Sequence, residues 1–123
     1  MLFEKLNYDF DNTILIQSFD YCRQLTYKTA KNFYFSFIFL PADLRAAIYT
    51  IYAFCRIADD IADDEFISEP EKIKRFAEFD KLFDKCFQPN AVSHQLFTAL
   101  QYVVHKYELS RENLADIVAG VRM

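Results

Sequence analysis

The chain has 123 residues, of which 53% are hydrophobic and 18% aromatic, with 14 Phe and 8 Tyr but one Gly and three Pro. So few turn-forming residues exclude an all-β fold, and this length allows one domain at most. The formal net charge of −4, with no block rich in Lys or Arg, gives no reason to expect a nucleic-acid partner. Because the apolar runs are long and spaced for helices, the sequence predicts a single all-α domain.

Helical periodicity and capping signals predict six helices and no strand. Asp11 or Asn12 caps the first helix, and Pro41 ends the second, which continues the first or follows a kink. Pro41 also suits the first turn of the third helix. Ser68 and Ser110 have the sequence context of N-caps. The predicted ranges in chain order are 12–31, 32–40, 44–66, 69–87, 91 or 93 to 107, and 110 toward 120.

Three cysteines are widely separated and form no C-x-x-C pair, which argues against a zinc site or a disulfide framework. We expect reduced, buried thiols at Cys22, Cys55 and Cys86. The N-terminus lacks the continuous apolar core of a signal peptide, and the apolar run at 33–40 is too short to span a membrane. These features predict a cytoplasmic protein that is soluble or peripheral to the inner membrane.

The most informative segment is YAFCRIADDIADD at positions 52–64, where an apolar helical pattern ends in four aspartates. Asp59 and Asp63 are spaced i, i+4, as are Asp60 and Asp64, so each pair shares a helix face. Like charges at this spacing repel, and carboxylates near a helix C-terminus oppose the macrodipole. Such a cluster is a candidate for a divalent cation, since Mg²⁺ is typically held by one or two carboxylates plus substrate phosphates. A plain solvated helix end is the alternative.

Projection of the helix at 44–66, at roughly 100° per residue, places its apolar residues on one stripe. Asp59 lies at the margin of this stripe and Asp63 one turn further along, whereas Asp60 and Asp64 point further outward. The projection predicts a polar pocket with an apolar floor beside the first pair. The stripe comprises Leu44, Ala47, Ile48, Ile51, Phe54, Cys55, Ala58 and Ala62.

Three blocks, in this order and spacing, resemble the squalene/phytoene synthase family: NFYFSFIFLP at 32–41, RAAIY at 45–49 and IYAFCRIADDIADD at 51–64. The resemblance extends from about residue 21 to the end of the chain. It implies the N-terminal part of an all-α, isoprenoid-synthase-type helical bundle. It further implies Mg²⁺-dependent, head-to-head condensation of two prenyl diphosphates, such as farnesyl diphosphate, toward squalene- or phytoene-type products of hopanoid or carotenoid biosynthesis.

The resemblance also implies roles for individual residues. Asp59 and Asp63 match the first aspartate-rich motif, which holds Mg²⁺ and the diphosphate, with Asp60 as a supporting metal ligand. Arg56 matches an arginine that contacts the diphosphate, and a guanidinium fork suits phosphate oxygens. Tyr52 matches a pocket tyrosine. The predicted catalytic residues are thus Asp59, Asp63, Arg56 and Tyr52.

Substrate contacts are implied on the preceding helix as well. Phe33 and Phe37 match aromatic residues that flank the reacting chain, and aromatic faces stabilise an allylic cation. The family often has two serines just before the first aromatic, where this chain has Ala30 and Asn32. Among these two positions only Asn32 has a side chain that can donate to the diphosphate, and we include it with Phe33, Phe37 and Arg56 as substrate-binding residues.

The sequence ends before the second aspartate-rich motif of the family, so residues 1–123 match only a partial domain. We therefore expect the chain to be inactive by itself and to self-associate through exposed apolar surface. The alternative function is that of a non-catalytic, truncated helical fragment that only packs against a partner. The residues present do not distinguish squalene, dehydrosqualene and phytoene as products.

Overall fold

The computed structural model describes residues 12–122 and contains six α-helices, with no strand among those residues. The all-α prediction is confirmed, whereas the predicted cap at Asp11 lies outside the described residues. No helix within 12–122 is long and apolar enough to cross a lipid bilayer. The helices are α2 (Asn12–Thr29), α3 (Lys31–Ser36), α4 (Ala42–Asp63), α5 (Glu69–Lys85), α6 (Phe97–Lys106) and α7 (Arg111–Arg122).

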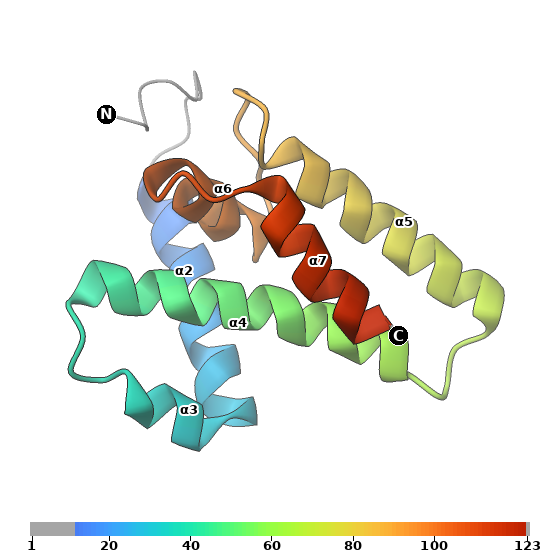
Figure 1. Cartoon of the computed structure of the whole chain (residues 1–123), viewed down its shortest axis with the longest axis horizontal. Coiled ribbons are helices and arrows are strands. Elements are labelled where there is room, and N and C mark those ends of the chain that lie inside the picture. The colour runs from blue at the N-terminus through green and yellow to red at the C-terminus, as the bar shows by residue number, and fades with distance from the viewer. Residues whose placement is uncertain (1–11, 123) are drawn as a thin grey trace.

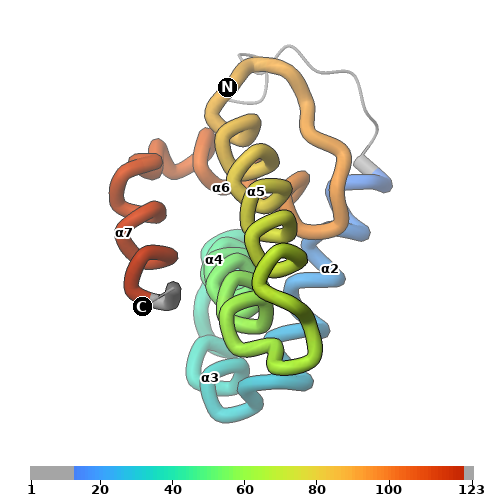
Figure 2. The backbone as a smooth tube through the Cα atoms, turned by 90° about the vertical axis from the view of Figure 1, so that its right-hand side faces the viewer, coloured from blue at the N-terminus to red at the C-terminus, as the bar shows by residue number. Residues whose placement is uncertain are grey.

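Helix α4 is the central element of the fold. It contacts α2, α5, α6 and α7, and it crosses α2 in the view of Figure 1. The short helix α3 lies below α4 in that view and joins it through a turn at one end of the molecule. Figure 2 shows α2 and α7 on opposite sides of α4. One face of α4 is buried in the core by these contacts, and the residues on its other face are available for a site.

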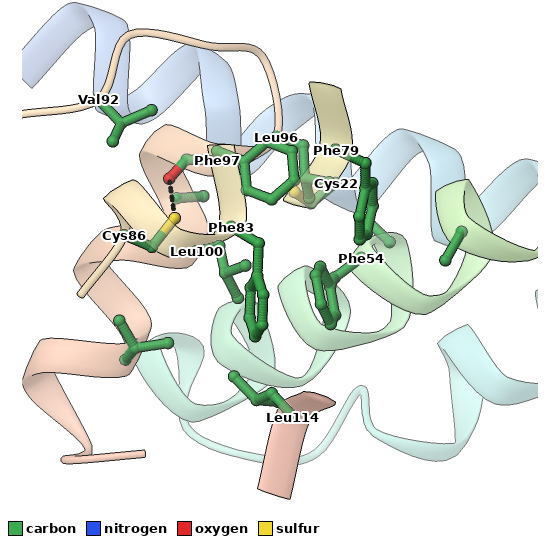
Figure 3. Close-up of a cluster of buried hydrophobic side chains, with 14 of the residues drawn as sticks. Cys22, Phe54, Phe79, Phe83, Cys86, Val92, Leu96, Phe97, Leu100 and Leu114 are labelled. Carbon is green, nitrogen blue, oxygen red and sulfur yellow. Dashed lines mark hydrogen bonds between the residues drawn. The ribbon is translucent and has the colours of Figure 1, made fainter. Parts of the chain in front are cut away.

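The core is organised around Phe54, which is completely buried in the middle of α4. Its ring centroid lies 5.2 Å from that of Phe79, 5.1 Å from that of Phe83 and 6.3 Å from that of Phe97 (Figure 3). Pairs of this kind contribute about 0.5–1.5 kcal/mol each beyond the area that they bury. One phenylalanine thus ties α4 to α5 and α6.

All three cysteines are free, as the sequence predicts. Cys22 and Cys86 are fully buried and Cys55 is half-buried. Burial raises the pKa of the Cys22 thiol to about 12, and burial also raises the pKa of the Cys86 thiol. Because the thiolate is the reactive form, these two thiols act as core side chains.

Helix α4 is shifted from its predicted range of 44–66, beginning at Ala42 and ending at Asp63. Pro41 is its N-cap and so lies just before the first turn. At the other end, Phe66 N–H donates to Asp64 Oδ1 at 2.9 Å, and Arg75 Nη1 lies 3.6 Å from Asp64 Oδ2. This Asx-type turn competes with further helix. The predicted outward orientation of Asp64 is therefore wrong, because its carboxylate turns back to close the α4–α5 connection.

The predicted caps of the two helices that follow serines are confirmed. Ser68 Oγ accepts the Glu71 N–H at 3.2 Å and begins α5, and Ser110 Oγ accepts the Asn113 N–H at 3.3 Å before α7. Each bond satisfies a backbone donor that a helix N-terminus leaves free, typically stabilising the helix by about 1 kcal/mol. The cap signals in the sequence were therefore sufficient at these two helices.

Helix α6 begins at Phe97, later than the predicted start at residue 91 or 93. Side chains of α6 itself hold the preceding segment in a loop: Gln101 Oε1 accepts the Val92 N–H, and Thr98 Oγ1 donates to the Val92 carbonyl, both at 2.8 Å. His94 Nδ1 accepts the Leu96 N–H at 3.0 Å. These bonds satisfy backbone groups that a longer helix would otherwise have paired.

The buried face of α4 differs from the predicted stripe by roughly a quarter turn at 100° per residue. Ile48, Ile51 and Cys55 were predicted to be core residues but are only half-buried. Leu44, also assigned to the stripe, is exposed. The buried residues of α4 are Ala47, Tyr49, Thr50, Ala53, Phe54 and Ala58. Ile51 and Cys55 consequently pack at the edge of the core, where they also line a groove on the surface.

His94 provides a test of the start of α6. Burial lowers the pKa of His94, so the unfolded chain binds more protons as the pH falls through about 6.5, and the free energy of unfolding decreases there. His94→Asn keeps a cap acceptor but does not titrate. In urea unfolding at about pH 8 and about pH 5.5, we expect wild type to lose more stability than His94→Asn. Equal losses of unfolding free energy in wild type and His94→Asn would contradict the role of His94 as a cap acceptor before α6.

Candidate functional site

The face of α4 opposite Phe54 carries the residues that the sequence singled out. Tyr52, Arg56, Asp59 and Asp63 follow one another at spacings of three or four residues within one continuous helix. Residues at these spacings share a helix face. The rotation of α4 that buries Phe54 therefore turns these four side chains together away from the core.

An apolar groove of about 270 Å³ runs along the N-terminal half of this face. Helix α3 supplies one wall through Phe33, whose ring centroid lies 5.1 Å from that of Tyr52. Phe37 does not line the groove but packs behind Phe33, with 4.8 Å between the ring centroids. The groove is lined by Phe33, Ile48, Ile51, Tyr52 and Cys55.

The hydroxyl group of Tyr52 is held by Thr29 at the end of α2. The two hydroxyl oxygens lie 2.9 Å apart, and Thr29 Oγ1 donates its own proton to the Leu25 carbonyl at 2.7 Å. Because Thr29 has a single hydroxyl proton, Tyr52 is the donor in the pair. Sequence reasoning missed Thr29, because it lies 23 positions before Tyr52 and only the packing of α2 against α4 brings them together.

The C-terminal half of the same face is acidic and contains one arginine. Arg56 Nε lies 3.1 Å from Asp60 Oδ1, and this nitrogen is buried without a well-aligned hydrogen bond. Asp60 also faces α2, where its charge adds to the effect of burial in raising the pKa of Tyr21. The structure thus places Asp60 beside Arg56 and toward α2, away from the line of Asp59 and Asp63.

Asp59 and Asp63 form no ion pair or side-chain hydrogen bond with any residue in the described range 12–122. Within that range, no three His, Cys, Asp or Glu side chains gather closely enough to bind a metal on their own. Two unpaired carboxylates one helix turn apart, beside a guanidinium, do suit Mg²⁺ that is shared with an anionic ligand. The three-aspartate metal site, with Asp60 included, stays a prediction.

The remaining predicted residue, Asn32, lies exposed in the first turn of α3. Its backbone carbonyl accepts the Ser36 hydroxyl at 2.7 Å, and its side chain is not among those that line the groove. The structure therefore brings Phe33 and Tyr52 together, aligns Arg56, Asp59 and Asp63 with them, and leaves Asn32 apart. A role for Asn32 in binding stays a prediction.

Comparison with known proteins gives a consistent result. The sequence model of the squalene/phytoene synthase family matches residues 26–123. A phytoene synthase from Arthrospira platensis is 27% identical over 106 residues, which cover 86% of this chain and 34% of the relative. A phytoene synthase from Mycobacterium tuberculosis is 27% identical over 111 residues, covering 90% and 35%, respectively.

A third relative, the chloroplastic phytoene synthase 2 of Solanum lycopersicum, is 27% identical over 113 residues, covering 89% of this chain and 35% of the relative. The chain thus spans about a third of the length of the curated relatives that it matches. No solved structure matches the chain.

The two unpaired carboxylates of Asp59 and Asp63 repel each other, so we predict that they destabilise the C-terminal end of α4. We expect Asp63→Asn to raise the free energy of unfolding by about 0.5 kcal/mol at low salt, because it removes repulsion from Asp59 and an unfavourable charge at the helix C-terminus. Urea denaturation measures this gain, which should shrink at about 1 M salt. The matched variant Asp60→Asn loses the pair with Arg56 and should give no gain. Equal stabilisation by both would contradict the assignment.

Proposed function

The chain belongs to the squalene/phytoene synthase family, and we propose that it forms the N-terminal portion of a prenyltransferase that condenses two prenyl diphosphates head to head. Farnesyl diphosphate is a representative substrate, and Mg²⁺ is the proposed cofactor. The names of the relatives favour a phytoene-type product and a place in carotenoid biosynthesis. We also propose that the protein is cytoplasmic and acts at a membrane surface.

The observation that carries this proposal is the order of environments along one face of α4. Ile48, Tyr52 and Cys55 line the apolar groove, and Asp59 and Asp63 follow on the same face. The distance from residue 48 to residue 63 along the helix is roughly 22 Å, at 1.5 Å per residue. An apolar chain that ends in a diphosphate has the same order of polarity, with its tail in the groove and its head at the carboxylates.

Different residues of the chain would contact the diphosphate head and the apolar tail of the substrate. Asp59 and Asp63 would hold Mg²⁺, which when bound neutralises charge on a departing diphosphate. Arg56 can direct its guanidinium at phosphate oxygens, while its Nε lies 3.1 Å from Asp60 Oδ1. Tyr52 and Phe33 present aromatic rings to the groove, where their faces can stabilise an allylic cation. Thr29 positions Tyr52 through the hydroxyl pair.

The alternative is a helical fragment that only packs against a partner, and one observation favours it. A second groove, of about 500 Å³, lies between α5 and α7 and has a mostly apolar wall that includes Phe79, Phe83 and Val118. Such a surface suits a further helix or a second copy of the chain. This alternative predicts association without any dependence on Mg²⁺ or a diphosphate, so binding measurements distinguish the two functions.

We expect the chain to bind farnesyl diphosphate in a Mg²⁺-dependent manner, measured by titration calorimetry. Asp59→Ala and Asp63→Ala should each weaken binding at least about tenfold, the effect of losing one good charge-assisted contact. Phe33→Ala should weaken binding with and without Mg²⁺. Asp64→Ala is the matched control and should have a small effect, because the Asp64 carboxylate is already engaged by the Phe66 N–H and Arg75. Equal affinity of Asp63→Ala and wild type in Mg²⁺ would refute the metal-site assignment.

The chain by itself should bind substrate without converting it. Two diphosphates must be ionised or positioned by metal-binding carboxylates on facing helices, and in the described residues the proposed pair lies on α4 alone. Incubation with farnesyl diphosphate and Mg²⁺, followed by mass spectrometry of both the aqueous phase and the extracted hydrocarbons, should detect no condensation product. Formation of the cyclopropyl diphosphate or of dehydrosqualene by a monomer, neither of which requires a reductant, would show that the carboxylates of α4 are sufficient.

A further inference from the structure

The turn between α3 and α4 exposes an unusual amount of apolar surface. Phe39 at its tip is 96% exposed, and Phe35 is 51% exposed. Further exposed apolar side chains lie on both sides of the tip. We use the name corner patch for Tyr27, Phe35, Ile38, Phe39 and Leu44. In Figure 1 this turn lies at the left edge of the molecule, at the N-terminal end of α4.

Part of the backbone beneath the patch is already hydrogen-bonded. The N–H groups of Ile38 and Leu40 donate to the carbonyls of Phe35 and Phe37 at 3.3 and 3.1 Å. Arg45 Nη1 donates to the Ile38 carbonyl at 2.7 Å and anchors the turn to α4. Backbone groups that lack partners oppose transfer from water into lipid, so these internal bonds lower the free-energy cost of inserting the tip.

The surroundings of the patch are basic, although the chain is acidic. The chain has 14 basic and 18 acidic residues, whereas positions 27–45 contain Lys28, Lys31 and Arg45 and a single acidic residue, Asp43. Lys106 neutralises that residue, with Nζ lying 3.2 Å from the Asp43 carboxylate. Lys31 Nζ lies 5.2 Å from the centroid of the Tyr27 ring at the edge of the patch. Aromatic and apolar side chains beside lysines are typical of surfaces that bind anionic lipid headgroups.

A second exposed phenylalanine, Phe66, differs from the corner patch in the charge of its neighbours. Phe66 is 98% exposed in the α4–α5 connection, at the opposite end of α4 in Figure 1. The three residues before it, Asp63, Asp64 and Glu65, are acidic. Anionic headgroups would repel this acidic end. Although a phenylalanine is exposed at both ends of α4, the difference in charge predicts binding only at the corner patch.

We propose that the corner patch docks onto an anionic lipid bilayer, with Phe39 inserted among the acyl chains and Lys28 and Lys31 at the headgroups. The patch is continuous with the site, since α3 carries Phe35 in the patch and Phe33 in the groove wall. A docked corner would therefore bring the groove mouth close to a bilayer in which isoprenoid chains dissolve. The value of docking for substrate access rests on the proposed function, whereas the docking itself rests on exposure and charge alone.

The experiment is co-sedimentation of the purified chain with vesicles of phosphatidylcholine, alone or mixed with phosphatidylglycerol. We expect binding to the mixed vesicles and a partition coefficient that falls about tenfold in Phe39→Ser, at the lower end of the effect of burying a phenylalanine. Lys28→Gln and Lys31→Gln should each reduce binding to the mixed vesicles roughly fivefold. Phe66→Ser is the matched control and should bind like wild type. Circular dichroism verifies that each variant is folded.

Two outcomes overturn the docking proposal, and a third separates it from the proposed function. Absence of binding to the mixed vesicles, or equal losses in Phe39→Ser and Phe66→Ser, would exclude docking through the corner patch. If wild type is oligomeric by size-exclusion chromatography, fails to bind vesicles and becomes monomeric in Phe39→Ser, the patch joins two copies of the chain. Vesicle binding without any affinity for farnesyl diphosphate would overturn the proposed function and leave the docking intact.

Discussion

The burial of Phe54 fixes the rotation of α4, and the candidate site depends on that rotation. Rings from α5 and α6 enclose Phe54, and each residue along a helix advances by roughly 100°. Tyr52 and Asp59 consequently lie on the opposite face. A rotation of α4 by about half a turn would bring Asp59 into the aromatic core, where an unpaired charge is strongly unfavourable. The aromatic core and the acidic site face thus follow from one constraint.

The acidic end of α4 is locally unfavourable, and the rest of the molecule relieves only part of it. Asp60 is paired with Arg56, and Asp64 bonds the backbone of the next turn. Asp59 and Asp63 keep their mutual repulsion at a helix C-terminus, since no described residue pairs with them. Natural sequences are locally consistent except where function requires otherwise. The two carboxylates left without partners are therefore the ones for which a ligand role is the best physical explanation.

The helices could be predicted from the sequence because their signals are local. Ser68 and Ser110 cap helices within three residues of themselves. The rotation of α4 was harder to predict from the sequence. Ile48 and Ile51 are apolar residues that suit either a core or a groove, and here they line a groove. Thr50, by contrast, is buried with its hydroxyl bonded to the Ala46 carbonyl at 2.8 Å, so a polar residue belongs to the core. The late start of α6 and the contact between α2 and Tyr52 arise from side-chain bonds that only the assembled fold creates.

The charge order along α4 also constrains how an anionic ligand can bind. The helix dipole and the carboxylates of Asp59 and Asp63 make the C-terminal end of the site face negative, and Arg56 is already paired with Asp60. An apolar tail in the groove would bring its own anionic head toward this negative end, where Coulomb repulsion opposes binding. A divalent cation between head and carboxylates reverses the sign of that interaction. Dependence on a cation is therefore what this field predicts for any ligand with an apolar tail and a diphosphate head.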